Sequence, residues 1–131
     1  KDIMRYTVNI APELKGALIP KLTLQPLVEN ALYHGVKLKR ELGHIYVTGR
    51  IEGADILLQV TDDGVGMPPE WLAQLTRSIE EGERVGFGLS TVHERLQLFF
   101  GPPYGLSISS QPGVGTTVTI RIPWKKEESA L

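Results

Sequence analysis

The chain has 131 residues, of which 41% are hydrophobic and 22% are charged. These values are typical of one globular domain with a single core, and the chain is too short for two full domains. The formal net charge of −1 provides no strong field to attract nucleic acid or an anionic membrane. The absence of cysteine excludes disulfides, thiolate zinc sites and a cysteine nucleophile.

Further observations concern the context of the chain. No apolar run approaches the roughly 18 residues of a membrane-spanning helix, and no signal peptide is visible. The chain begins at Lys1 rather than at methionine, so we expect a fragment of a longer protein. A cysteine-free composition is compatible with the reducing cytoplasm.

The N-terminal third predicts a strand followed by a long helix. Segment 5–10 (RYTVNI) is expected to form a short strand, and 12–20 a linker. From about Lys21, apolar residues recur at three- and four-residue spacing, which predicts one apolar helix face. Pro26 starts or kinks this helix, and Gly43 ends it. The residues of the apolar face are Leu24, Leu27, Val28, Ala31, Leu32 and Gly35.

The rest of the chain predicts two hairpins and two helices. A turn through Gly53 and Asp55 joins the strands of the first hairpin, and 111–115 joins those of the second. The four strands are expected at 44–51, 56–62, 106–110 and 116–122. One amphipathic helix is expected from Pro69 to about Ile79, and another from Leu89 to Phe99, stopped by Gly101.

Together these elements predict a single domain over 1–131, with its core at about 5–123. The charged, glycine-bearing stretch 80–88 is expected to be mobile, and the polar tail 125–131 frayed. The fold class is α/β (α+β). It is a two-layer sandwich in which helices pack on one face of a mixed, mostly antiparallel sheet.

The first segment that carries chemistry is the helix around Glu29 and Asn30. Asn30 points away from the apolar stripe, on the side that also presents Pro26, Tyr33 and Lys37. An amide oxygen is a hard, neutral ligand suited to Mg²⁺, which shares its coordination with waters and substrate phosphates. The alternative is an ordinary solvated helix face.

The second segment is Asp62-Asp63-Gly64-Val65-Gly66-Met67. Asp62 has the strand parity of Ile56, Leu58 and Val60, so it ends a row that faces the core. A carboxylate there needs hydrogen-bond donors, and an adenine amino group is one. Gly64 and Gly66 allow the backbone to approach a flat ring. The alternative is an Asp-Gly turn that ends the strand.

The third segment is Gly86-Phe87-Gly88-Leu89, which opens a helix. Backbone amides at a helix N-terminus form an anion site, so a triphosphate can bind there. The preceding stretch, with Arg84, can close over a ligand as a lid. A simple loop or cap, with Arg84 solvated, is the alternative.

The fourth segment is Gly113-Val114-Gly115-Thr116. Thr116 has the parity of Val118, Ile120 and Ile122, so its hydroxyl also faces the core and needs a partner. Asp62, through a bridging water beside adenine, is a candidate partner. The alternative is a glycine-rich hairpin turn with a locally satisfied threonine.

The order and spacing of these segments resemble the GHKL ATP-binding (Bergerat) fold, which groups DNA gyrase, the Hsp90 chaperones, MutL and histidine kinases. The string 24–35 (LQPLVENALYHG) is similar to the N-box of LytS/YesM-type sensor histidine kinases. The string 88–96 (GLSTVHERL), followed by Phe100-Gly101, is similar to the Gly-x-Gly-Leu helix of that subgroup. The likeness covers about residues 5–123.

The resemblance implies ATP and Mg²⁺ as cofactors. It implies that Asn30 binds the metal, that Asp62 binds the adenine amino group, and that Glu29 lies near the γ-phosphate or its acceptor. The full nucleotide-binding set expected is Asn30, Tyr33, His34, Lys37, Asp62, Gly64, Gly66, Met67, Arg84, Gly86, Phe87, Gly88, Leu89 and Thr116.

Two residues depart from the family pattern. The family usually has lysine three residues after the N-box Asn, where this chain has Tyr33, and Lys37 is a candidate replacement. In the hydrolysing members a general-base Glu lies four residues before the Asn, where this chain has Pro26. Without a base to activate water, phosphoryl transfer to a protein acceptor is favoured over hydrolysis.

The family's acceptor histidine lies upstream in a Pro-His-Phe context, which His34, His44 and His93 lack. We therefore expect His44 and His93 to be structural or surface residues. The resemblance implies an upstream phosphoacceptor domain, a response regulator as indirect partner, and a membrane-anchored homodimeric parent with this domain in the cytoplasm.

Two alternatives share the fold. One is an anti-sigma-factor-like serine kinase, which the residues preceding Lys1 would distinguish. The other is an interaction module that has lost ATP, for which Tyr33 is the sequence support.

Overall fold

A computed structural model describes residues 4–12, 14, 27–29, 31–32, 43–82 and 88–124. Within these residues the chain forms one five-stranded sheet in the order β1-β2-β3-β5-β4. The strands are β1 (Met4–Ile10), β2 (Gly43–Glu52), β3 (Asp55–Asp62), β4 (Gly105–Gln111) and β5 (Gly115–Pro123). β1 pairs with β2 in parallel, and the other neighbours pair antiparallel. The predicted mixed, mostly antiparallel sheet is confirmed.

Each hairpin closes where the sequence predicts a turn. β2 and β3 are joined at Gly53, whose φ of 64° lies in the left-handed region that glycine adopts without a Cβ clash. β4 and β5 are joined across the Gln111–Gly115 pair, with Gly113 at a φ of 77°. All five strands begin and end within one residue of their predicted limits. The alternating apolar pattern and the glycine turns that predict these limits are the same features that set the strand ends in the structure.

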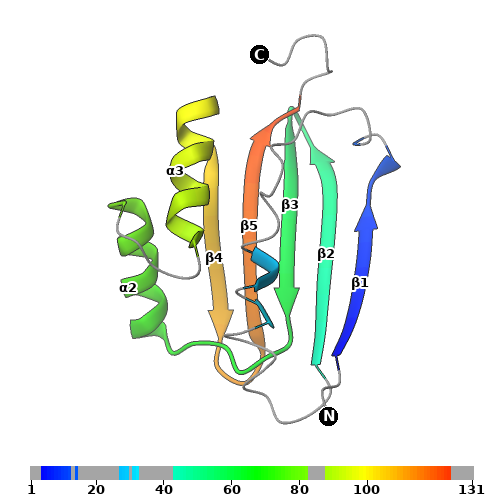
Figure 1. Cartoon of the computed structure of the whole chain (residues 1–131), viewed down its shortest axis with the longest axis vertical. Helices are drawn as coiled ribbons and strands as arrows, with labels where there is room; N and C mark the ends of the chain where they lie inside the picture. Colours follow the sequence, from blue (N-terminus) through cyan, green and yellow to red (C-terminus); the bar gives the residue numbers. More distant parts are fainter. Residues whose placement is uncertain are drawn as a thin grey trace.

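Two helices lie on one side of the sheet, over the edge that β4 forms (Figure 1). α2 (Pro69–Glu80) begins with a proline, which is tolerated in the first turn because no intrahelical partner exists there for its missing N–H. α3 (Leu89–Phe100) begins after Gly88, which has a left-handed φ of 88°. It ends at Gly101, whose N–H donates to the carbonyl of Gln97 at 2.8 Å. Both helices match their predicted ranges.

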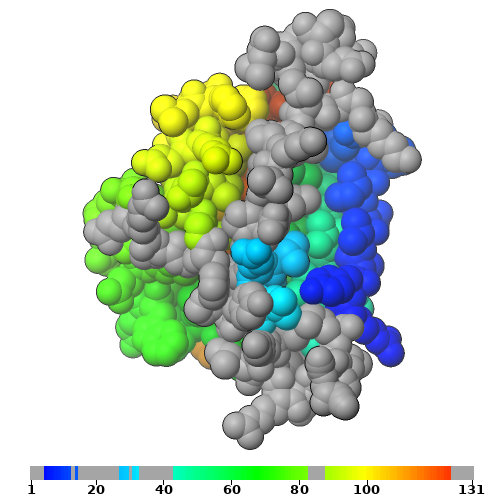
Figure 2. All heavy atoms as spheres, in the orientation of Figure 1, coloured from blue at the N-terminus to red at the C-terminus, as the bar shows by residue number. Residues whose placement is uncertain are grey.

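The core lies between this helical layer and one face of the sheet. Alternate residues of the three central strands point into it, and Leu27 and Ala31 cover them from the helical residues at 27–29 and 31–32. In Figure 2 these helical residues lie between α2 and α3 on one side and β1 on the other. The fully buried strand residues are Ile45, Ile56, Leu58, Val60, Val118, Ile120 and Ile122.

The opposite face of the sheet is polar and carries cross-strand hydrogen bonds. Gln59 donates to the hydroxyl of Thr119 at 3.0 Å, and the hydroxyls of Thr61 and Thr117 lie 3.0 Å apart. Sheets with one solvated face show this alternation. The helices and the core therefore occupy one face, as the sequence predicts.

A charged cluster joins the two hairpins at the end of the sheet where β3 begins and β2 and β5 end. Arg121 donates to Asp55 at 2.6 Å and to Glu52 at 2.8 Å. Tyr104 donates to the other Asp55 oxygen at 3.0 Å, and this hydrogen bond is the main reason that the pKa of Tyr104 is raised. The cluster ties the loop before β4 to the turn between β2 and β3.

Leu96 and Leu98 of α3 test how much of the stability comes from this core. Leu96 is 1% exposed and Leu98 is 83% exposed. We expect Leu96→Ala to lower the free energy of unfolding by about 2–5 kcal/mol, because it removes buried methyl groups and leaves a cavity. Leu98→Ala should change it by less than about 0.5 kcal/mol. Urea unfolding followed by circular dichroism measures both, and equal losses would contradict this packing.

Candidate functional site

Three polar side chains form a row across adjacent strands at one end of the sheet. Asp62 ends β3 and is directly opposite Thr116 of β5, which is directly opposite Ser110 of β4. Opposite residues in an antiparallel pair point to the same face, here the one that carries the core. Asp62 is 3% exposed and Thr116 is 7% exposed. The predicted inward orientation of both is confirmed. In Figure 1 the row lies where β3 and β4 end and β5 begins.

The carboxylate of Asp62 shapes the loop that follows it. Its Oδ1 accepts the backbone N–H of Gly64 at 2.8 Å, an arrangement in which an aspartate supports a turn two residues later. This local bond is the turn that sequence reasoning kept as an alternative. A carboxylate offers about four acceptor positions, so supporting the turn and binding a ligand amino group are compatible roles.

Ser110 is a member of this site that the sequence reasoning missed. Its Oγ lies 2.8 Å from Thr116 Oγ1, donates to the Gly115 carbonyl at 3.0 Å and accepts the Met67 N–H at 2.9 Å. The partner expected for Thr116 was Asp62 through a water, whereas the direct partner is Ser110. Two features of the sequence could have indicated Ser110. It has the strand parity of Ile108, and it lies opposite Thr116 in the hairpin.

The glycines of the two loops allow the loops to pack closely against other backbone of the same chain. Gly66 has a φ of 71°, and a Cβ there would lie 1.9 Å from the carbonyl oxygen of Gln111. Gly115 has a φ of 141°, and a Cβ there would lie 2.0 Å from the carbonyl oxygen of Asp62. The Gly113 N–H also donates to the Val65 carbonyl at 2.8 Å. The loop after β3 and the β4–β5 turn therefore interlock. Gly66 was expected to let the backbone approach a ligand ring. In the structure it lets the backbone approach that of Gln111.

The N-box helix is described only in part. Leu27 and Ala31 are buried, and Val28 and Leu32 pack against the core, as the predicted apolar face requires. Glu29 is half-buried. The other predicted site residues of this helix, Asn30, Tyr33, His34 and Lys37, lie outside the described residues.

The third predicted segment is described from Gly88 onward, so Arg84, Gly86 and Phe87 lie outside the described residues. Leu89 is 0% exposed and belongs to the core. Its side chain anchors the start of α3, so contact with a ligand from this position would come from its backbone. Of the predicted set, the structure brings together Asp62, Gly64, Gly66, Met67 and Thr116.

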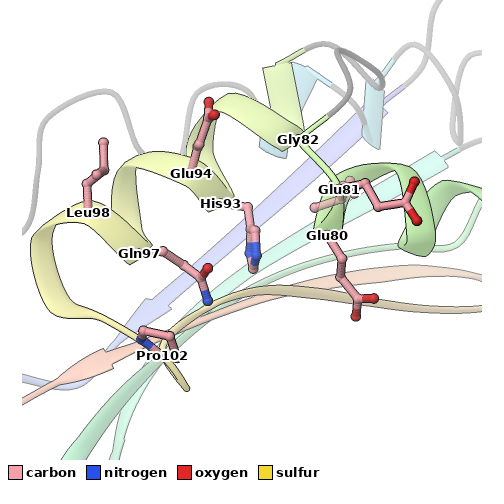
Figure 3. A pocket seen from close by; sticks show the side chains of 9 residues that line it. Glu80, Glu81, Gly82, His93, Glu94, Gln97, Leu98 and Pro102 are labelled. Atoms are coloured by element: carbon pink, nitrogen blue, oxygen red, sulfur yellow. The ribbon is translucent and has the colours of Figure 1, made fainter.

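A groove of about 420 Å³ between the end of α2 and α3 contains none of the predicted site residues. His93 and Gln97 point from α3 toward the strands, whereas Glu94 and Leu98 point away (Figure 3). His93 Nδ1 accepts the Leu106 N–H at 3.0 Å, and Gln97 donates to the Tyr104 carbonyl at 3.0 Å. His93 thus fastens α3 to β4 and Gln97 fastens it to the loop before β4, which gives His93 the structural role expected of it.

His44 also makes protein contacts. Its Nε2 lies 2.7 Å from the Thr7 hydroxyl, and its ring stacks on Tyr46 with centroids 4.0 Å apart. Among the described residues, no group of three His, Asp or Glu side chains is arranged to hold a metal ion. In the same part of the chain, no helix combines the length and apolarity needed to cross a membrane.

Comparisons with known proteins agree with this geometry. The family model described as "Histidine kinase-, DNA gyrase B-, and HSP90-like ATPase" matches residues 19–126. The chain is 34% identical over 125 residues to the sensor histidine kinase BtsS of Escherichia coli, covering 94% of this chain and 20% of BtsS. It is 36% identical over 127 residues to the sensor histidine kinase YesM of Bacillus subtilis, covering 97% of this chain and 21% of YesM.

A solved structure shares the fold. The histidine kinase domain of the blue-light activated kinase EL346 of Erythrobacter litoralis superposes with a TM-score of 0.66 at 22% identity. The match covers 95% of this chain and 56% of that domain.

The chain therefore belongs to the family of histidine kinase-, DNA gyrase B- and HSP90-like ATPases. Within that family it is similar to the sensor histidine kinases BtsS and YesM, and the predicted likeness to the YesM type is confirmed. The chain spans about a fifth of the length of these relatives.

Alanine substitutions at two glycines measure the interlock of the two loops. Gly66 and Gly113 have φ angles of 71° and 77°, but a Cβ at Gly113 would meet nothing within 4 Å. Gly113→Ala should therefore cost only the left-handed conformation, about 1–2 kcal/mol. Gly66→Ala should cost at least about 1 kcal/mol more, because the backbone of Gln111 must move. Chemical denaturation of the two variants gives the difference, and equal values would show that the loops do not interlock.

Proposed function

We propose that this chain is the ATP-binding catalytic domain of a sensor histidine kinase. In this proposal it binds Mg-ATP and donates the γ-phosphoryl group to a histidine in a separate upstream phosphoacceptor domain. The observation that carries the proposal is Asp62, a carboxylate buried at the end of a core-facing strand beside Thr116. The family to which the chain belongs, and the names of its relatives, support the same function.

Asp62 is suited to recognise adenine by its amino group. A buried carboxylate without donors is costly, and a ligand N–H adds a charge-assisted hydrogen bond that is stronger than a neutral one. The Gly64 N–H donates to this carboxylate, and the Met67 N–H donates to Ser110, which is in the same row. We assign the contact with the base to Asp62, Gly64, Gly66, Met67 and Thr116.

The triphosphate is assigned to the residues of the other motifs. Asn30 would hold Mg²⁺, and Glu29 would lie near the γ-phosphate or its acceptor. The backbone around Gly86, Phe87 and Gly88 would approach the phosphates at the start of α3, where helix amides favour anions. Arg84 would act from the lid.

Tyr33, His34 and Lys37 complete the proposed phosphate side of the site. Lys37 would supply the positive charge that Tyr33 lacks.

Transfer to a protein acceptor is proposed in preference to hydrolysis. Phosphoryl transfer depends mainly on positioning and on electrostatic stabilisation of the phosphate oxygens, and hydrolysis also needs a group that orients water. Pro26 stands where hydrolysing members have the general base. The further proposals are a response regulator that receives the phosphoryl group, and a membrane-anchored homodimeric parent with this domain in the cytoplasm.

Nucleotide binding tests the adenine assignment. We expect the chain to bind ATP in the presence of Mg²⁺, and Asp62→Asn to weaken binding by about 10- to 100-fold, the effect of losing one hydrogen bond to a charged group. Asparagine retains an oxygen that can accept the Gly64 N–H, so the turn is preserved. Isothermal titration calorimetry with a non-hydrolysable ATP analogue gives both affinities.

Asp63→Asn is the matched control. Asp63 is the next residue, and its Oδ1 accepts the His44 N–H at 2.9 Å on the neighbouring strand. This substitution should leave the affinity within about twofold of the unmodified chain. Undiminished binding by Asp62→Asn would contradict the assigned base contact.

A chimaera tests the transfer reaction. We expect YesM in which this chain replaces the matching region to incorporate phosphate from γ-labelled ATP in an acid-labile, base-stable form, as a phosphohistidine does. Asn30→Ala should reduce labelling at least about tenfold, because the metal ligand is lost. Acid-stable label would favour the serine-kinase alternative, and absent label despite ATP binding would contradict histidine phosphorylation by this domain.

A further inference from the structure

We propose that β1 is a docking edge for a second copy of this chain, and that the two β1 strands pair antiparallel about a two-fold axis at Thr7. The five-stranded sheets of the two copies then form one continuous sheet. The inference concerns a different strand from the base site and does not depend on ATP binding, so the two proposals can fail separately.

β1 forms one edge of the sheet. In the described part of the chain it pairs with β2 alone (Figure 1), and residues 5–9 are all exposed. The pairing with β2 is one-to-one without a bulge, and the strand contains no proline. Its one charged residue, Arg5, has the parity of Thr7 and therefore points to the polar face. An edge strand without a bulge, a proline or an inward-pointing charge is a template for another strand.

Tyr6 and Val8 give this edge an apolar surface. They lie opposite Ile45 and Val47 of β2, which are buried in the core, so they point to the helical side of the sheet. Both nevertheless remain exposed, Tyr6 at 50% and Val8 at 65%. β1 is therefore the edge at which a partner strand buries apolar surface. At the opposite edge, the exposed residues of β4 are polar: Ser107, Ser109 and Gln111.

The direction of the β1 backbone determines which residues can bond to a second strand. The Ala11 N–H, just after β1, donates to the Gly49 carbonyl of β2 at 2.9 Å. Backbone groups of successive residues point to opposite sides of a strand, so Thr7, four residues earlier, also directs its N–H and C=O toward β2. Tyr6 and Val8 direct theirs to the open side. These are the groups that a second strand would satisfy.

These directions favour one register for two copies of β1. A two-fold axis at Thr7, the middle residue of the strand, aligns the whole strand of one copy with that of the other. Tyr6 then lies opposite Val8 of the second copy, so residues with outward backbone groups form the hydrogen-bonded pairs. Aromatic and β-branched residues are favourable cross-strand neighbours. Arg5 lies opposite Asn9 of the second copy, so no like charges meet. The strand is therefore complementary to itself.

The pairing has a consequence for the two base sites. A two-fold axis that joins antiparallel strands in one sheet is perpendicular to the sheet, so the helical layers of both copies lie on the same face. Asp62 is opposite Ile45, which is opposite Tyr6. The row that contains Asp62 therefore continues across the joint to Val8 of the second copy, and both base sites open on one side of the joined sheet.

Sedimentation velocity of the whole chain tests the association. A single strand edge is a small interface, so we expect weak pairing, with the average mass rising from monomer toward dimer between about 10 µM and 1 mM. Val8→Lys places a charge on the edge and should raise the midpoint concentration at least about tenfold. Leu98→Lys is the matched control, because it makes the same kind of change at a residue of α3 that is 83% exposed, and it should leave the midpoint unchanged.

Three results would overturn the inference. They are a monomeric mass throughout this concentration range, an equal effect of Val8→Lys and Leu98→Lys, and growth beyond the dimer, which a closed two-fold pairing does not allow. ATP binding by a chain that stays monomeric would contradict this inference alone. A dimer that binds no nucleotide would contradict the proposed function alone.

The absence of cysteine from the chain permits a direct test of the register. Thr7→Cys places two thiols across the axis in a non-hydrogen-bonded pair, with Cα atoms about 4.5 Å apart, which a disulfide can bridge. Asn9→Cys is the matched control on the same face, because its thiol lies four residues, roughly 13 Å, from that of the second copy. We expect Thr7→Cys alone to give a disulfide-linked dimer under mild oxidation, measured by non-reducing electrophoresis. Equal cross-linking of the two variants, or none with Thr7→Cys, would contradict the register.

Discussion

The structure depends on a carboxylate that is held inside the protein at the end of a strand. Asp62 follows Ile56, Leu58 and Val60 in the row that faces the core, and it is as deeply buried as the core residues before it. Such a group is tolerated only where donors reach it. The Gly64 N–H is one of them. This requirement sets the course of the loop after β3. The position of that loop then determines how closely the β4–β5 turn can approach it.

The two faces of the sheet show how the same residue types take different roles. Thr116 and Thr117 are neighbours on β5, but one hydroxyl lies in the buried row and the other pairs with Thr61 on the polar face. Because side chains alternate along a strand, one residue of register decides between the buried row and the polar face. The core-facing row of β3 therefore combines packing and chemistry, with apolar residues along most of its length and Asp62 at its end.

Most of the fold could be predicted from the sequence, because its signals are local. Strand alternation and glycine turns located the hairpins, and three- and four-residue spacing located the helices. The burial of Asp62 and Thr116 followed from parity alone. Ser110 was missed because strand parity marks it only as a core-facing residue, whereas its importance arises from three partners on other segments, Met67, Gly115 and Thr116. The contact of Gly66 with Gln111 was missed for the same reason, because Gln111 is distant in sequence. Predictions for Asn30 and Gly86 concern residues outside the described part of the chain and remain predictions.

The interlock between the loop after β3 and the β4–β5 turn has a consequence for how the chain folds. Met67 and Ser110 are 43 residues apart, and the pairing of Asp62 with Thr116 spans a comparable length of chain. Contacts of such high sequence separation form late, because the entropy of closing the loop must be overcome first. The row of Asp62, Thr116 and Ser110 therefore exists only once β5 has docked between β3 and β4. A ligand that uses this row binds the completed sheet alone, so it stabilises the native state as a whole by mass action.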